Sequence, residues 1–188
     1  MFAQTPTIVA ESLRLSPVSY LVLGLIGLRG ASTPYQLKRA ASRSINYFWP
    51  FPHSQLYGEP ERLAAAGLLS EEREEAGRRR KLYSLTPLGK QALEAWLATP
   101  PAAIFEMRDM AVLQLFFGEF TTRETIVRLA EDQVRLCRER LAVYQTIADQ
   151  YHTAPMSQRR MAPLELGIRM VQTYIDFWSD VARHPPEI

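Results

Sequence analysis

The step Thr99-Pro100-Pro101 most restricts how this chain can fold. Each proline removes a backbone donor and pushes the residue before it out of the helical conformation. Before the step, short segments alternate with turn residues; after it, helical periodicity runs through long stretches without strand patterns. We therefore expect an N-terminal extension at residues 1–14, one domain at residues 15–99 and a second domain at residues 102–188.

Composition places the chain among globular proteins. Of its 188 residues, 47% are hydrophobic and 22% are charged, both close to the average for folded domains. A single cysteine, Cys137, cannot form an intrachain disulfide, which is typical of a reducing compartment. The run Val18–Leu28 is shorter than the roughly 20 residues of a membrane span, and the first residues lack a secretory pattern. We expect a cytoplasmic protein without a membrane segment.

Helix start signals divide the first half into short helices. Ser16-Pro17 and Thr33-Pro34 each place a capping residue before a proline at the first helical position. The first of these helices should stop near Gly30. A third helix is expected from Ser54, as its cap, to Gly67, a glycine suited to the left-handed end of a helix.

The end of the first half adds a hairpin. Two candidate strands, Leu68–Arg73 and Arg80–Leu85, flank a glycine-containing loop of hairpin length. Thr86-Pro87 then opens another helix. Pro60 should kink the third helix or distort its first turn, because it deletes a backbone hydrogen bond. The order helix, helix-turn-helix, hairpin, helix predicts a winged helix-turn-helix domain with a small β-hairpin wing.

The second half is predicted to be entirely helical. We expect a helix at Glu106–Phe117, a capping box at Thr121–Glu124 followed by a helix of about 30 residues, and a last helix at Leu164–Ala182. The last helix carries two apolar faces, which implies two packing partners. The expected fold is mainly α, with a C-terminal antiparallel helical domain that forms a homodimer. The two faces are Leu164, Ile168, Val171, Ile175, Trp178 and Ala182, and Leu166, Met170, Tyr174 and Phe177.

Charge is concentrated in the first half, which has 12 Lys and Arg against 8 Asp and Glu. The contiguous cluster Arg78–Lys81 is dense enough to indicate a polyanion partner, although a solvated turn is the simpler alternative. A helix after a tight turn can enter the major groove while a hairpin reaches neighbouring phosphates. The candidate DNA contacts are Tyr35, Gln36, Lys38, His53, Ser54, Gln55, Tyr57, Arg62, Arg78, Arg79, Arg80 and Lys81.

Five motifs stand out in the first half. They are Tyr47-Phe48-Trp49-Pro50, Ser54-Gln55-Leu56-Tyr57, Arg62-Leu63, Ala66-Gly67-Leu68-Leu69 and Arg80-Lys81-Leu82-Tyr83-Ser84-Leu85-Thr86-Pro87-Leu88-Gly89. Together they resemble the PadR family of transcriptional regulators over roughly residues 15–95, and the second half is similar in architecture to the C-terminal dimerisation domain of the larger members. The resemblance implies a DNA-binding regulator, most often a repressor, that binds operator DNA as a homodimer and is released by a small, often aromatic or drug-like effector. The two recognition helices of a dimer call for an inverted-repeat operator.

Two features depart from that family pattern. Members usually have proline directly after the tyrosine of the second motif, whereas this chain has Gly58 there and Pro60 two positions later. The start of the recognition helix is therefore expected to bend differently. The extension Met1–Arg14 is also longer than the motifs require, and its apolar residues could pack on a partner subunit.

Aromatic residues suggest an effector pocket where the two halves or two subunits meet, because ligand pockets favour aromatic walls and domain interfaces. The simpler alternative for each residue is a place in the core or the dimer contact. The pocket candidates are Trp96, Phe105, Phe117, Tyr174 and Trp178.

The sequence gives no support for metal binding or catalysis. His53, His152 and His184 lack metal-ligand spacing, and no catalytic or nucleotide-binding motif occurs, so we expect no metal, no cofactor and no enzymatic activity. Cys137 falls on an apolar stripe, where a thiol behaves as a small hydrophobe. A winged-helix protein-interaction module without specific DNA binding remains the alternative function. It would be favoured if acidic neighbours pair off the cluster Arg78–Lys81.

Overall fold

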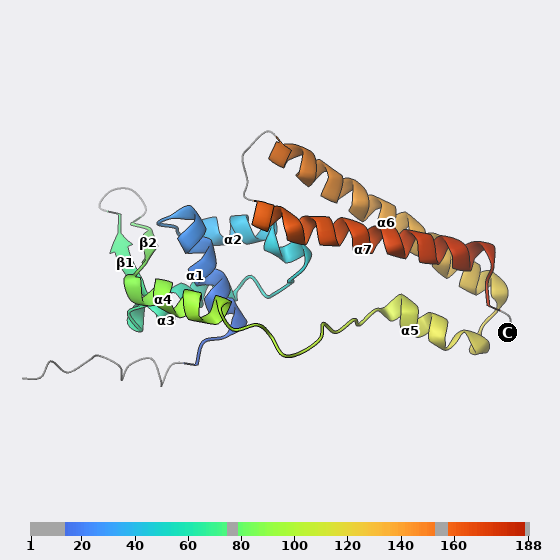
Figure 1. Ribbon diagram of the computed structural model, residues 1–188, viewed down its shortest axis with the longest axis horizontal. Helices are drawn as coiled ribbons and strands as arrows, with labels where there is room; N and C mark the ends of the chain where they lie inside the picture. The colour runs from blue at the N-terminus through green and yellow to red at the C-terminus, as the bar shows by residue number, and fades with distance from the viewer. Residues whose placement is uncertain (1–13, 75–78, 153–157, 187–188) are drawn as a thin grey trace, which may run out of the picture. The chain divides into compact units, whose positions relative to one another are not determined.

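The structure is a computed structural model that describes residues 14–74, 79–152 and 158–186 (Figure 1). The chain divides into two compact units, residues 1–104 and residues 105–188, and each is described by itself. Both units are mostly helical, as predicted, and the first contains the expected hairpin. Within the described ranges, no helix combines the length and hydropathy needed to cross a membrane. The proposed extension at residues 1–14 lies outside the described residues, except for Arg14.

The first unit has the winged-helix order of elements. Its starts at Ser16 and Thr33 are confirmed: each side chain accepts the backbone N–H three residues on, and Ser19 and Gln36 reciprocate as capping boxes. Thr86 likewise caps its helix through the Gly89 N–H. The elements are α1 (Pro17–Arg29), α2 (Pro34–Ser42), the 3₁₀ turn η1 (Ile45–Tyr47), α3 (Gln55–Ala65), β1 (Leu69–Arg73), β2 (Lys81–Leu85) and α4 (Pro87–Leu97).

The hairpin is antiparallel, with Leu69 opposite Leu85 at its base and Arg73 opposite Lys81 toward its tip. On the other side of β2, Ser32 exchanges two backbone hydrogen bonds of 3.0 Å with Tyr83. Strand β2 therefore lies between β1 and the segment that leads into α2. This pairing joins the wing to the helical part of the unit.

One apolar core holds the first unit together. Residues Val22, Ile26, Leu37 and Leu63 are almost fully buried where α1, α2 and α3 meet. Each such side chain contributes about 1.5–3 kcal/mol relative to an exposed position. At the base of the hairpin, a Cβ on Gly89 would lie 2.0 Å from the Leu68 carbonyl oxygen, so α4 begins in direct contact with the wing.

Helix α3 begins differently from the prediction. Its end at Gly67 is confirmed by a φ of 74°, but Ser54 makes no capping bond. Ser54 already has helical angles, φ −57° and ψ −31°, whereas a capping side chain requires an extended backbone. The carbonyls of residues 52–54 instead accept N–H groups three residues later, as in a 3₁₀ turn. The entry to α3 is thus a 3₁₀ turn, and Pro60 lies buried further along the helix, where it removes the hydrogen bond to the Leu56 carbonyl.

The second unit contains α5 (Met110–Phe116), the 3₁₀ turn η2 (Gly118–Phe120), α6 (Arg123–His152) and α7 (Gln158–Arg183). The prediction of a helix from Glu106 is wrong. Asp109 is extended, at φ −115° and ψ 120°, and its carboxylate accepts the N–H groups of Ala111 and Val112, which starts α5 at Met110.

The two long helices also differ from the predicted bounds. The 30 residues of α6 confirm the expected length, but its cap is Thr122, which accepts the Thr125 N–H at 3.3 Å, one residue later than the predicted box. Helix α7 begins at Gln158 rather than Leu164 and contains Pro163. Pro163 is the sixth residue of α7, so its missing N–H deletes one intrahelical hydrogen bond, as Pro60 does in α3.

Helices α6 and α7 lie side by side as an antiparallel pair (Figure 1). Ile126 and Ala130, near the start of α6, share a core with Trp178 and Val181, near the end of α7. The second apolar face of α7 is not covered in the same way, since Leu166, Met170 and Phe177 are exposed. The two predicted faces of this helix are thus present, and its own unit buries one of them.

Candidate nucleic-acid interface

The outer surface of α3 carries three of the predicted contacts. Leu56 and Leu63 point into the core, whereas Ser54, Gln55 and Tyr57 are exposed. Amide and hydroxyl groups at the start of a recognition helix can reach base edges or phosphates. His53 is half-buried, with its ring edge-on to Phe51 at 5.4 Å between centroids. Base contacts by these side chains stay a prediction.

Helix α2 carries a second group of predicted DNA contacts. Tyr35 is exposed, and Lys38 is half-buried. Gln36 is exposed, but its Oε1 accepts the Thr33 N–H at 2.8 Å, so the amide oxygen is committed to the cap. Only its amide nitrogen is left to donate to an external acceptor.

Sequence reasoning missed two cations on this surface, Arg39 and Arg43. Both are exposed, and neither forms an ion pair within the described part of the chain. A signal for them existed, because no Asp or Glu occurs between Glu11 and Glu59. That acid-free stretch runs through α1 and α2 to the first turn of α3, so its positive potential is not offset locally.

Arg62 was predicted to face DNA, but its guanidinium is committed within the chain. It donates to both carboxylate oxygens of Glu59, at 2.9 and 2.7 Å, and to the hydroxyl of buried Ser19 at 3.0 Å. The Glu59 side chain is only 13% exposed. Burial raises the pKa of Glu59, but the hydrogen bonds from Arg62 and Ser19 outweigh it and hold that pKa below its usual value. The geometry assigns Arg62 to the attachment of α3 to α1.

The hairpin cations fall into two groups. Arg80 Nε lies 2.9 Å from Glu74, and Lys81 Nζ lies 3.0 Å from Glu61 and 3.2 Å from Glu71. Arg79 is exposed, has a left-handed φ of 47°, and forms no ion pair with another described residue; Arg78 lies outside the described residues.

Pairing by acidic neighbours is the arrangement that we associated with a protein-interaction module, and it holds for two of the three described cations of the cluster, Arg80 and Lys81. The Arg80 and Glu74 side chains are both at the surface, where an ion pair contributes little and a phosphate can replace the carboxylate. Lys81 pairs with two carboxylates, and its side chain is 31% exposed against 64% for Arg80. We therefore expect its role to differ from that of Arg79 and Arg80.

The predicted effector residues are not gathered into one pocket within either unit. Trp96 stacks on Tyr20 in the first unit, with centroids 4.7 Å apart. In the second unit, Trp178 is fully buried, and its Nε1 has no acceptor among the described residues. Phe105 is exposed, and Tyr174 donates to the sulfur of Met107 at 2.8 Å.

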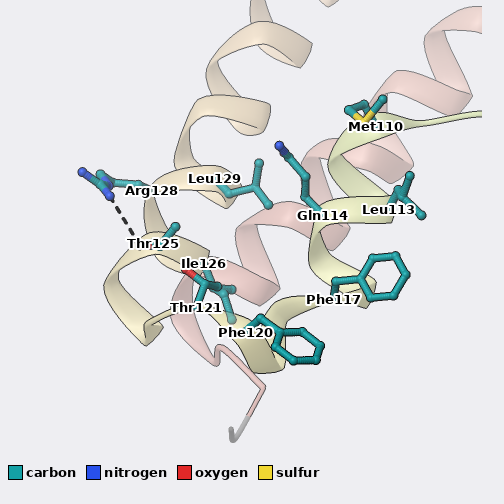
Figure 2. Close-up of a pocket in the computed structure, with 10 residues that line it drawn as sticks. All are labelled: Met110, Leu113, Gln114, Phe117, Phe120, Thr121, Thr125, Ile126, Arg128 and Leu129. Carbon is teal, nitrogen blue, oxygen red and sulfur yellow. Dashed lines mark hydrogen bonds between the residues drawn. The ribbon is translucent and has the colours of Figure 1, made fainter.

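Phe117 lines an open groove of about 570 Å³ on the second unit (Figure 2). The groove is mainly apolar, and the Arg128 guanidinium, which donates to Thr125 at 3.4 Å, lies at its polar side. The residues that line it are Met110, Leu113, Gln114, Phe117, Phe120, Thr121, Thr125, Ile126, Arg128 and Leu129.

Neither metal binding nor thiol chemistry gains support from this arrangement. Across the ranges that the structure describes, no cluster of three or more His, Cys, Asp or Glu side chains could hold a metal ion. Cys137 is half-buried, and burial together with the charge of Asp109 raises the pKa of its thiol. The neutral thiol is therefore favoured, as expected for a residue that packs rather than reacts.

Comparison with known proteins assigns both parts of the chain. Residues 22–95 match the model of the transcriptional regulator PadR-like family, and residues 107–183 match the model of the virulence activator alpha C-terminal family. The chain is 27% identical over 127 residues to the negative transcriptional regulator PadR of Bacillus subtilis, an alignment that covers 66% of this chain and 69% of that protein.

Solved structures agree in fold. The structure of Bacillus subtilis PadR in complex with operator DNA has a TM-score of 0.81 at 22% identity, covering 89% of this chain and 98% of that one. The same protein in complex with p-coumaric acid has a TM-score of 0.74 at 22% identity, covering 90% and 97%. The chain thus carries a PadR-like domain at residues 22–95, from a family of transcriptional regulators and not of enzymes, followed by a C-terminal region that matches the virulence activator alpha C-terminal family.

Proposed function

We propose that this protein binds operator DNA as a homodimer, represses the adjacent gene and is released by a small aromatic effector. The observation that carries the proposal is the outer surface of α2 and the first turn of α3, where exposed Gln55 and Tyr57 accompany Arg39 and Arg43, two cations without an ion pair among the described residues, in a stretch with no Asp or Glu between Glu11 and Glu59. Hydrogen-bonding groups beside cations are what a DNA duplex requires, because bases give sequence discrimination and phosphates give affinity.

Each element then has a role on the duplex. Helix α3 enters the major groove, where Gln55 can form paired hydrogen bonds with adenine and Tyr57 can reach a base edge or a phosphate. Lys38, Arg39 and Arg43 on α2 lie across the backbone, as the first helix of a helix-turn-helix does. Arg79 and Arg80 on the hairpin supply further phosphate contacts.

Dimerisation is supported by the second unit. The exposed face of α7 is formed by Leu166, Met170 and Phe177, and Phe116 and Phe120 of the same unit are exposed as well. Large apolar side chains left exposed in this number are typical of a protein contact. A two-fold dimer presents two copies of α3, which calls for an operator with an inverted repeat.

Repression and effector release are supported by the relatives. The similar protein from Bacillus subtilis is a negative regulator, and one structure of it contains p-coumaric acid. We infer that an aromatic ligand of similar size binds this protein and lowers its affinity for DNA, with the exposed Phe105 and Phe117 of the second unit as candidates for contact with it. A chromosomal operator also places the protein in the cytoplasm.

The test is a fluorescence-anisotropy titration with a 30-base-pair duplex taken from the region upstream of the protein's own gene, and with a scrambled duplex of equal composition. Preference for the upstream duplex at physiological salt, with affinity that falls steeply as salt rises, supports the proposal. Binding to neither duplex would reject it and favour the protein-interaction module.

A further inference from the structure

The inner face of the hairpin changes from apolar to charged along its length. Alternate residues of a strand share one face, so Leu69, Glu71 and Arg73 of β1 lie on the same face as Leu85, Tyr83 and Lys81 of β2. At the base, Leu69 is buried, and Leu85 packs against the core. Toward the tip, the same face ends in charged side chains. Lys81 is thus on the side of the hairpin that faces the rest of the unit.

Lys81 is held there by carboxylates from two different elements. Its Nζ lies 3.0 Å from Glu61, which projects from α3, and 3.2 Å from Glu71 on β1. Tyr83, which is buried, donates its hydroxyl to the same Glu71 oxygen at 3.2 Å. The Lys81 and Glu71 side chains are only 31% and 26% exposed. One ammonium therefore connects the recognition helix with both strands of the wing.

We propose that Lys81 positions the wing against the recognition helix, through Glu61 and Glu71, and is not itself a phosphate ligand. The inference rests on the proposed function, since it concerns how the DNA-binding surface is built. It separates Lys81 from Arg79 and Arg80, which precede it in the sequence.

The chemistry of the ammonium supports this separation. A lysine has three donors, and two of them are used by Glu61 and Glu71. Its hydrogen bonds to Glu61 and then to Glu71 raise the pKa of Lys81, so it stays charged and paired at neutral pH. A phosphate would have to compete with two carboxylates that are already in place, whereas Arg79 has no such competitor among the described residues.

The two roles predict opposite effects of Glu61→Gln. If Lys81 were a phosphate ligand, removal of its competitor would strengthen DNA binding. If Lys81 positions the wing, the same change releases the wing from α3 and weakens binding. The matched control is Glu72→Gln, which also removes one negative charge. Glu72 lies on the outer face of β1 and has no ion pair within the described residues.

The experiment measures the affinity of the full-length protein for the upstream duplex over a series of salt concentrations. We expect Glu61→Gln and Lys81→Met to weaken binding by about 2- to 30-fold, as changes in a network outside the contact do, with the salt dependence unchanged. Lys81→Arg should restore binding, and Glu72→Gln should not weaken it. Tighter binding by Glu61→Gln, or a salt slope that falls by about 0.9 in Lys81→Met, would overturn the proposal.

Hydrogen exchange of the free protein gives a readout independent of DNA. Backbone amides of β1 and β2 should exchange faster in Glu61→Gln and Lys81→Met than in the wild type, and at the wild-type rate in Glu72→Gln. Unchanged exchange in the first two variants contradicts the inference, whatever the DNA result. If the wild type binds no duplex, the proposed function fails, and the exchange rates still decide whether Lys81 holds the wing.

Discussion

The two units of this protein bury their apolar side chains to different extents. The first closes its core within one chain: α1, α2 and α3 bury their apolar residues, and buried Ser19 is bonded to Ser16 and Arg62. The second buries one face of α7 and leaves Leu166 and Phe177 exposed. Under the proposed function, the first unit reads DNA and needs a rigid shape of its own, whereas the second forms a dimer and keeps apolar surface for its partner.

The largest effect is expected where the first unit is most tightly closed. Gly89→Ala places a Cβ 2.0 Å from the Leu68 carbonyl oxygen, far inside van der Waals contact, and that oxygen belongs to the backbone. We expect the free energy of unfolding to fall by about 4 kcal/mol or more, measured by urea denaturation. Gly24→Ala is the control, because a Cβ there meets nothing within 4 Å, and alanine favours a helix. Equal stability of the two variants would show that the contact between α4 and the wing can relax.

Substitutions on the exposed apolar face of α7 should weaken dimerisation and leave the folding of the second unit intact. Phe177→Ser combined with Leu166→Ser removes two exposed apolar side chains from α7. We expect the dimer dissociation constant to rise by about 100-fold, equivalent to roughly 3 kcal/mol, while the fold of each unit is kept. Sedimentation velocity measures the change. Leu28→Ser, an exposed position in the first unit, is the control. An intact dimer in the double variant would place the contact elsewhere.

The attachment of α3 to α1 makes the first unit sensitive to acid. Glu59→Gln breaks the pair with Arg62, and we expect a loss of about 1–2 kcal/mol in the free energy of unfolding at pH 7, less than for a fully buried pair because Arg62 is partly exposed. The folded pKa of Glu59 lies below its unfolded value of about 4.3.

The stabilisation by the Glu59 carboxylate is therefore complete above the unfolded pKa and disappears as pH falls through the folded pKa. Unfolding curves of the wild type and Glu59→Gln should converge at the acidic end of this range. A difference in stability that stays constant down to pH 2 would show that the carboxylate charge is not what stabilises the attachment.

The smallest effect is expected for the discrimination between DNA sequences by the first unit. Gln55→Ala should reduce the preference for the upstream duplex over the scrambled duplex by about 1 kcal/mol, the lower end of the value for a paired base contact. Arg39→Ala should weaken both duplexes equally. If Gln55→Ala keeps the preference and His53→Ala removes it, the first turn of α3 presents a different side chain to the bases.

Local signals in the sequence were sufficient for much of the fold. The helix starts at Ser16, Thr33 and Thr86 and the helix end at Gly67 could all be predicted, because each partner lies within a few residues along the chain. The start of α5 was missed although its cap, Asp109, is also local, since apolar periodicity before it imitated a helix.

Tertiary structure alone decided the roles of the charged residues. The sequence shows that Arg62 and Lys81 are cations in a basic half, but their partners, Ser19 and Glu61, lie 43 and 20 positions away. Whether a cation meets DNA or a carboxylate depends on which elements the fold brings together, because ion pairs form across space between groups that periodicity treats as independent. The sequence by itself thus determined the winged helix and the helical second half, and the packing of α3 against α1 and β1 determined which of the described cations are paired with carboxylates.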